Sequence, residues 1–186
     1  MAPSERPSEK RLVKAGAEYL ARQGYRTYID PDHSDYFDLV ARKGDEVGLV
    51  EAKIADARTV LAQALTRRVW GSWVAVLLYP PRRARSLEER TRERRGSPVG
   101  VWTWDGSAVE VLRPARSWVV EGREDPYAEL RARFRQVLDA LDRGDVPTGL
   151  AWDSVPGAVR RASNGRRFRE WRLDEAGPDT PRSGGE

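Results

Sequence analysis

Three polar residues, Asp38, Glu51 and Lys53, have the side chains that a hydrolytic metal site needs. Two carboxylates can bind a hard divalent cation such as Mg²⁺ or Mn²⁺, and a neighbouring ammonium adds positive charge at the same place. The chain has no Cys and a single His, which excludes thiolate metal sites and zinc sites built on several His. Any metal chemistry would therefore be carboxylate chemistry.

A predicted hairpin brings these three side chains together. Apolar-rich runs on either side of the Gly-Asp dipeptide at 44–45 predict two strands joined by a tight turn. That turn sets Asp38 directly opposite Glu51 on one face, with Cβ atoms about 5 Å apart. Lys53 projects from the same face and Ala52 from the opposite, core-facing one. Like charges placed so are destabilising, and a cation between them would reverse the sign.

A helix must lie before this hairpin. Ser8 can cap a helix from about Glu9 to Gln23, which Gly24 closes. At about 100° per residue, Glu9 projects onto the inward, apolar face of this helix. It is either an additional residue of the site or a first-turn acidic residue that interacts with the helix dipole.

The remaining elements follow from hydrophobic periodicity and turn residues. We expect an α/β fold with a mixed central sheet flanked by helices, and a mostly helical, Arg-rich C-terminal extension. The expected division is a disordered N-terminus (1–7), a core (8–115), the extension (116–173) and a disordered tail (174–186). The expected elements are strands at 25–29, 37–43 and 47–54, a helix at 57–69, a strand at 72–79, a short exposed helix from about 87, strands at 99–104 and 108–112, and a helix at 127–143.

Asp38, followed by Glu51-Ala52-Lys53 at the end of the next strand, resembles the PD-(D/E)xK nuclease superfamily, whose members share the restriction-endonuclease-like fold. The resemblance covers about residues 8–112 and is nearest to the Holliday-junction-resolvase and Mrr-like branch. The chain departs from the family in having Phe37 where many members have Pro before the Asp.

The resemblance implies a role for each matching residue. Asp38, Glu51 and the backbone carbonyl of Ala52 would bind Mg²⁺ or Mn²⁺, and Lys53 would position or activate the attacking water and stabilise charge on the phosphate. Glu9 matches a first-helix Glu that several members add to the metal site. Gln63 resembles a Gln that some branches place beside the site, although helical geometry points it away from the apolar face of its own helix. Asp35 is a second choice of ligand.

Two Arg-rich segments are candidates for contact with nucleic acid, at 82–95 and 156–173. The first is otherwise an exposed charged helix. The second is otherwise an element that docks on the core, with its Arg residues paired to the acidic linker. The basic residues selected for contact are Arg82, Arg83, Arg85, Arg160, Arg161, Arg166, Arg167 and Arg169.

Together these features predict a Mg²⁺-dependent nuclease that acts on DNA, in the cytoplasm and as a homodimer, in repair, restriction or mobile-element biology. No apolar run reaches the roughly 18 residues of a transmembrane helix, so no membrane association is expected. The first alternative is a nucleic-acid-binding module on this fold without catalysis. A second is a partner-binding protein of a defence or repair complex. For the three residues themselves, the alternative to a catalytic site is a solvated sheet face with a cross-strand Lys–Glu pair.

Overall fold

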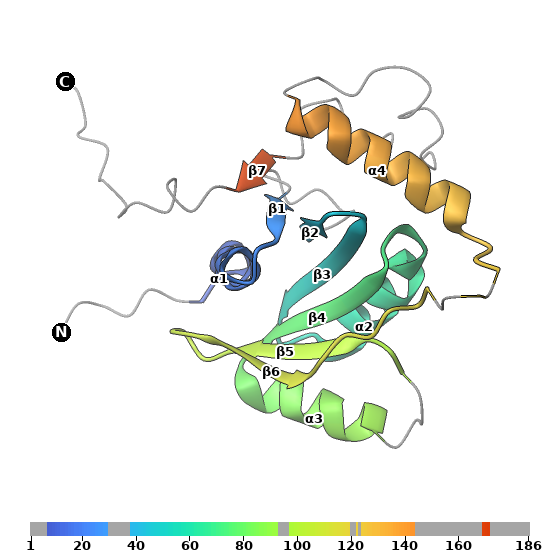
Figure 1. The fold of residues 1–186 in the computed structure, drawn as a ribbon. Coiled ribbons are helices and arrows are strands. Elements are labelled where there is room, and N and C mark those ends of the chain that lie inside the picture. Colours follow the sequence, from blue (N-terminus) through green and yellow to red (C-terminus); the bar gives the residue numbers. More distant parts are fainter. Residues whose placement is uncertain are drawn as a thin grey trace, which may run out of the picture.

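The computed structural model describes residues 7–29, 38–92, 97–119, 122 and 124–143, and the backbone of 169–171. Its helices are α1 (Glu9–Arg22), α2 (Ala57–Arg67), α3 (Pro81–Arg92) and α4 (Ala128–Asp142), with a 3₁₀ turn η1 (Arg68–Trp70). Its strands are β1 (Arg26–Ile29), β2 (Leu39–Lys43), β3 (Glu46–Ile54), β4 (Trp73–Tyr79), β5 (Gly100–Trp104), β6 (Val109–Arg113) and β7 (Arg169–Trp171). The expected α/β class, a mixed sheet flanked by helices, is confirmed (Figure 1).

The seven strands form one sheet in the order β6-β5-β4-β3-β2-β1-β7. The pairs β3/β4 and β4/β5 are parallel, and the other neighbours are antiparallel. The two parallel connections, through α2 and α3, step in the same direction across the sheet. Since such crossovers are right-handed, both helices fall on the same face of the sheet.

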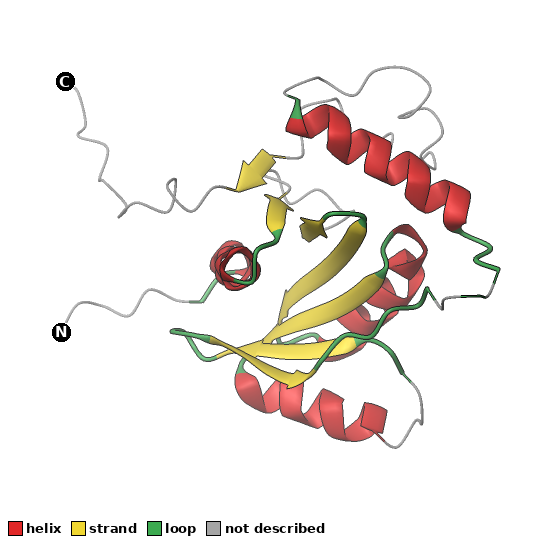
Figure 2. Ribbon diagram, viewed as in Figure 1, coloured by secondary structure: helices red, strands yellow, loops and turns green. Residues whose placement is uncertain are grey.

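Each face of the sheet has its own apolar core. On one face, α1 packs Leu12, Val13, Ala17 and Leu20 against strand residues that include Trp73 and Trp102. On the other, residues of α2, α3 and α4 surround Val74, Val76 and Leu78 of β4. Strand β4 is therefore buried on both sides, as its unbroken apolar run predicts. Figure 2 separates the sheet from the helices that cover it.

The hairpin of β2 and β3 has the predicted register. Lys43 pairs with Glu46 across a two-residue turn, and Leu39 pairs with Val50. Gly44 has a φ of 60°, a left-handed backbone conformation that glycine adopts easily and that is unfavourable for residues with a side chain. Asp38 immediately precedes Leu39, so continuing the register sets it opposite Glu51. The local turn chemistry is enough to bring the two carboxylates together.

Two expectations about the helices need correction. Helix α3 begins at Pro81, not near Leu87, because a proline fits the first turn of a helix, where its missing N–H is not needed. It is also not merely an exposed helix, since Ala84 and Leu87 are buried in the core.

Helix α4 lies where the sequence predicts it and packs Phe134 into the same core. Strand β7, which was not expected, adds to the outer edge of β1.

Candidate functional site

The candidate site lies where β2 begins and β3 ends. Glu51 is fully buried, and Asp38 accepts a hydrogen bond at Oδ2 from the Ala52 N–H, at 2.7 Å. A residue within a strand turns its N–H and its C=O to the same side. The Ala52 carbonyl therefore also faces the side of β3 on which Asp38 lies, as a metal ligand would. The Ala52 methyl group is buried on the opposite face, in the core under α1.

The pKa values of both carboxylates are raised above their ordinary values. Burial raises the pKa of Glu51, and the charge on Asp38 raises it further, to about 8, although Arg67 and Lys53 oppose the change. Burial also raises the pKa of Asp38, against the opposing effects of the Ala52 amide, Lys53 and Arg67. Without a cation, the pair is therefore reluctant to carry two negative charges near neutral pH.

Lys53 and Glu9 complete the group, although Glu9 belongs to the helix on the other face of the sheet. The Lys53 Nζ donates a hydrogen bond to Glu9 Oε2 at 3.1 Å. Burial disfavours the charge on Lys53, but the carboxylates of Asp38, Glu9 and Glu51 outweigh it and raise the pKa of Lys53. The lysine is therefore an ammonium at neutral pH, suited to stabilising negative charge more than to removing a proton from water.

Arg67 is the site residue that the sequence analysis missed. Its Nη1 donates a hydrogen bond to Glu51 Oε2, and the two side chains are 12% and 1% exposed. The signal was present in the helical spacing: Arg67 follows the buried Val60 by seven residues, about 20° short of two full turns. An arginine so close to a buried stripe needs an anionic partner, and Glu51 is that partner.

Gln63 does not point away from the protein as helical geometry suggested. Its side-chain oxygen Oε1 is buried and has no hydrogen-bond partner among the described residues. The buried stripe of α2 is formed by Ala57, Val60 and Ala64, whereas Leu61 and Leu65 are only partly buried. This rotation of the stripe carries Gln63 towards the protein.

The residues present fit a divalent cation in one specific respect. The second oxygen of Glu51, Oε1, is buried and accepts no hydrogen bond from any described residue. It is a hard, anionic oxygen next to a second carboxylate, which is the donor chemistry that Mg²⁺ and Mn²⁺ prefer. Within the described ranges, no group of three or more His, Cys, Asp or Glu side chains is arranged to hold a metal ion. The candidate centre thus rests on two carboxylates and one backbone carbonyl.

The Arg residues selected for nucleic-acid contact fall into three groups. Arg82 and Arg83 are exposed in the first turn of α3, directly after β4, whose last residue pairs with Ile54 at the end of β3. They therefore lie at the same sheet edge as Lys53. Arg85 pairs with Glu110 of β6, at 3.4 Å. The remaining five lie outside the described side chains, as do Asp35 and His33: Arg160, Arg161, Arg166, Arg167 and Arg169.

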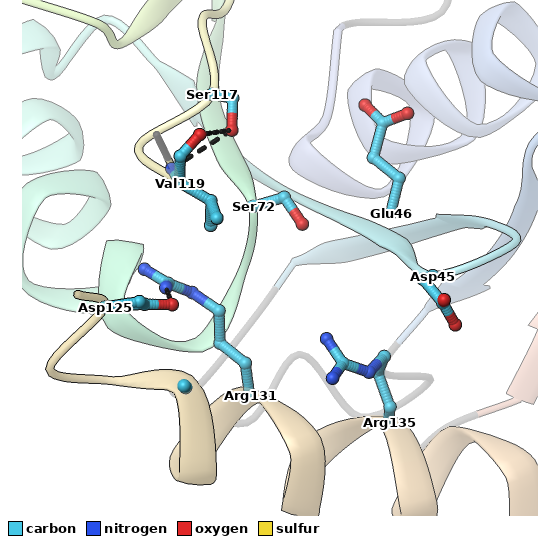
Figure 3. Close-up of a pocket in the computed structure, with 9 residues that line it drawn as sticks. Asp45, Glu46, Ser72, Ser117, Val119, Asp125, Arg131 and Arg135 are labelled. Carbon is cyan, nitrogen blue, oxygen red and sulfur yellow. Dashed lines mark hydrogen bonds and ion pairs between the residues drawn. The ribbon is translucent and has the colours of Figure 1, made fainter. Parts of the chain in front are cut away.

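A cavity of about 590 Å³ lies at the opposite end of the hairpin, next to its turn (Figure 3). Asp45 and Glu46 line it from the hairpin, and Arg131 and Arg135 from α4. Several of its polar groups already have partners: Arg131 donates to the Gly71 carbonyl at 2.8 Å and also to Asp125. The cavity and the carboxylate pair are thus separate features, at opposite ends of β3.

No protein-family model matches this chain, and no curated protein matches it. Among solved structures, it is similar to a protein of unknown function from Silicibacter pomeroyi. The two are 17% identical, the match covers 74% of this chain and 95% of that one, and the TM-score is 0.46. None of the helices in the described ranges is long and apolar enough to cross a membrane.

Proposed function

We propose that this chain is a divalent-metal-dependent nuclease that hydrolyses phosphodiester bonds in DNA, an endonuclease of the PD-(D/E)xK type acting in the cytoplasm. The observation that carries the proposal is the Asp38–Glu51 pair: two largely buried carboxylates set opposite each other, with Glu51 Oε1 lacking any described hydrogen-bond donor. A purely structural role does not account for this arrangement, because like charges at opposite positions weaken a hairpin.

In this proposal Asp38, Glu51 and the Ala52 carbonyl hold the cation. When bound, Mg²⁺ or Mn²⁺ polarises a phosphate oxygen and lowers the pKa of a coordinated water. The Lys53 ammonium stabilises the negative charge that develops on the phosphate. Its hydrogen bond to Glu9 limits where the flexible lysine side chain can place that charge. Arg82 and Arg83, at the same edge of the sheet, are available to contact the phosphate backbone.

A second candidate function is a nucleic-acid-binding module without catalysis, and one observation favours it. The Arg67 guanidinium donates to Glu51 Oε2 and supplies part of the positive charge that a cation would, as it would in a permanently inactive site. In that case, the protein binds DNA in a salt-sensitive manner and no cation is required. Cleavage therefore distinguishes the two functions.

The test is to incubate the purified full-length protein with linear duplex, branched and single-stranded DNA, with Mg²⁺, Mn²⁺ or EDTA. The informative variants are Asp38→Ala and Lys53→Ala, and the matched control is Lys43→Ala. Lys43 ends the other strand of the hairpin near its turn, where its ammonium donates to the Gln23 carbonyl. We expect metal-dependent cleavage that the control retains and that both site variants lose by about 100-fold or more.

Two results would overturn the proposal. If the wild-type protein binds DNA but cuts none of these substrates with either metal, the non-catalytic module is favoured. If Asp38→Ala or Lys53→Ala cuts as well as the control, the candidate site is not the catalytic one. A variant that loses cleavage must retain the wild-type circular dichroism spectrum, so that unfolding is excluded as the cause.

A further inference from the structure

Helix α2 ends with a charged side chain directed at the candidate site. Arg67 is the last residue of this helix and Glu51 lies on the strand beneath it. The Arg67 side chain is 12% exposed, and its guanidinium donates to Glu51 Oε2. Such a buried charge pair is costly to form, because each ion loses its hydration, so stability alone is a weak explanation for it.

The two carboxylates of the site are held in the same manner. Asp38 uses one oxygen, Oδ2, to accept the Ala52 N–H at 2.7 Å. Glu51 uses one oxygen, Oε2, to accept from Arg67, and its Oε1 has no described donor. Each carboxylate is thus fixed through one oxygen to a rigid donor: a backbone amide in a strand, or a guanidinium at the end of a packed helix.

We propose that Arg67 is a positioning residue of the metal site, which fixes the Glu51 carboxylate through Oε2 and so presents Oε1 to the divalent cation. The inference rests on the proposed function, since it concerns the same metal site. Carboxylates that bind metals commonly have such a hydrogen-bonded partner behind them, which orients them and increases affinity. Arginine suits this role because its planar guanidinium stays charged and holds a carboxylate in a defined orientation.

A rival role for Arg67 makes the opposite prediction. If the guanidinium occupied the position of the metal, removing it would strengthen metal binding. The hydrogen-bond pattern argues against this competition, because Arg67 engages Oε2 and leaves Oε1 without a described partner. A cation can therefore reach Glu51 while the Arg67 pair stays intact.

The experiment is a calorimetric titration of the full-length protein with Mn²⁺, without nucleic acid. Arg67→Ala removes the guanidinium, Arg67→Lys retains a positive charge, and Arg68→Ala is the matched control. Arg68 is the next residue, but its guanidinium donates to the Leu65 carbonyl at 2.9 Å and stacks on Trp118. We expect Arg67→Ala to raise the Kd for Mn²⁺ by roughly 10- to 100-fold, Arg67→Lys to restore part of the loss and Arg68→Ala to change it little.

The outcomes separate this inference from the proposed function. A wild-type protein that does not bind Mn²⁺ refutes the metal site and, with it, the role of Arg67. A wild-type protein that binds Mn²⁺ and cuts DNA, with equal affinity in Arg67→Ala, refutes the positioning role alone. Tighter binding by Arg67→Ala also refutes it, in favour of competition. If Arg67→Ala does not fold, Arg67→Lys decides: an affinity equal to wild type overturns the inference.

Discussion

The hairpin of β2 and β3 carries a charged cluster near each end, on the same face of the sheet, and the two clusters are built in opposite ways. Near the turn, Arg42 pairs with Asp139 at 2.6 Å and with Asp142 at 3.3 Å. Asp142 also pairs with Arg26 at 2.9 Å and accepts a hydrogen bond from the buried Tyr28 hydroxyl. Two cations and two anions are interleaved, and each acid contacts a base.

At the other end of the same strands, like charges face each other. Asp38 lies opposite Glu51, and burial together with that proximity raises the pKa of Glu51 to about 8. Arg67 and Lys53 approach from neighbouring positions and compensate for this only in part, because the net effect on the pKa of Glu51 is still upward. One oxygen of Glu51 has no described donor at all.

In the proposed function, this contrast separates charges that stabilise the fold from charges that bind a cation. The cluster near the turn needs nothing further and explains how α4 is attached to β1 and β2. The cluster at the other end has fewer cations (Lys53 and Arg67) than anions (Glu9, Asp38 and Glu51). Such a deficit of positive charge is typical of sites that bind a cation. Perturbing each cluster in turn tests this distinction.

The largest change in stability is expected from Asp142→Ala. The substitution removes the acceptor of the buried Tyr28 hydroxyl and a partner of both Arg26 and Arg42. We expect a loss of about 3 kcal/mol in the free energy of unfolding, measured by urea denaturation at neutral pH. The matched control, Asp45→Ala in the exposed hairpin turn, should change it by less than about 0.5 kcal/mol. If the two variants are equally stable, the cluster does not hold α4 in place.

Glu51→Gln should have a smaller effect of opposite sign, because it removes the like-charge conflict. The folded-state pKa of Glu51, about 8, lies above its ordinary value of 4.5. Between these pH values, the folded state keeps a proton that the unfolded state releases, so the wild type loses stability as the pH rises through this window. We expect the variant to be about 2 kcal/mol more stable than wild type at pH 9 and nearly equal to it at pH 4.5.

Thermal or urea unfolding at several pH values measures this difference. The same measurement with Mn²⁺ adds a second test. A cation that binds only the folded wild type should reduce or reverse the difference in the free energy of unfolding between Glu51→Gln and wild type. A variant that is less stable than wild type at pH 9 would show that the Arg67 ion pair outweighs the repulsion from Asp38. The carboxylate pair would then be structural.

How much of this could be predicted from the sequence depends on how local the determining interactions are. The facing of Asp38 and Glu51 was predictable, since two turn residues set the register of a hairpin. The contact between Arg67 and Glu51 was not recognised, because the helical spacing places Arg67 beside the buried stripe but does not show which strand residue lies opposite it. The attachment of α4 through Asp142 depends on residues about 100 positions apart. No periodicity along the chain encodes such a contact.

The smallest effect is expected from Glu9→Gln, and it tests whether Glu9 belongs to the site or only to its helix. The Lys53 and Glu9 side chains are 25% and 41% exposed, so their ion pair should contribute less than about 1 kcal/mol. The matched control is Glu18→Gln, the same substitution on the same helix and, by helical geometry, on its opposite side. If Glu9 only serves its helix, the two variants should cleave DNA at the same rate. We expect stabilities within about 0.5 kcal/mol of each other but slower cleavage by Glu9→Gln alone, because the Lys53 ammonium loses the partner that restricts its position.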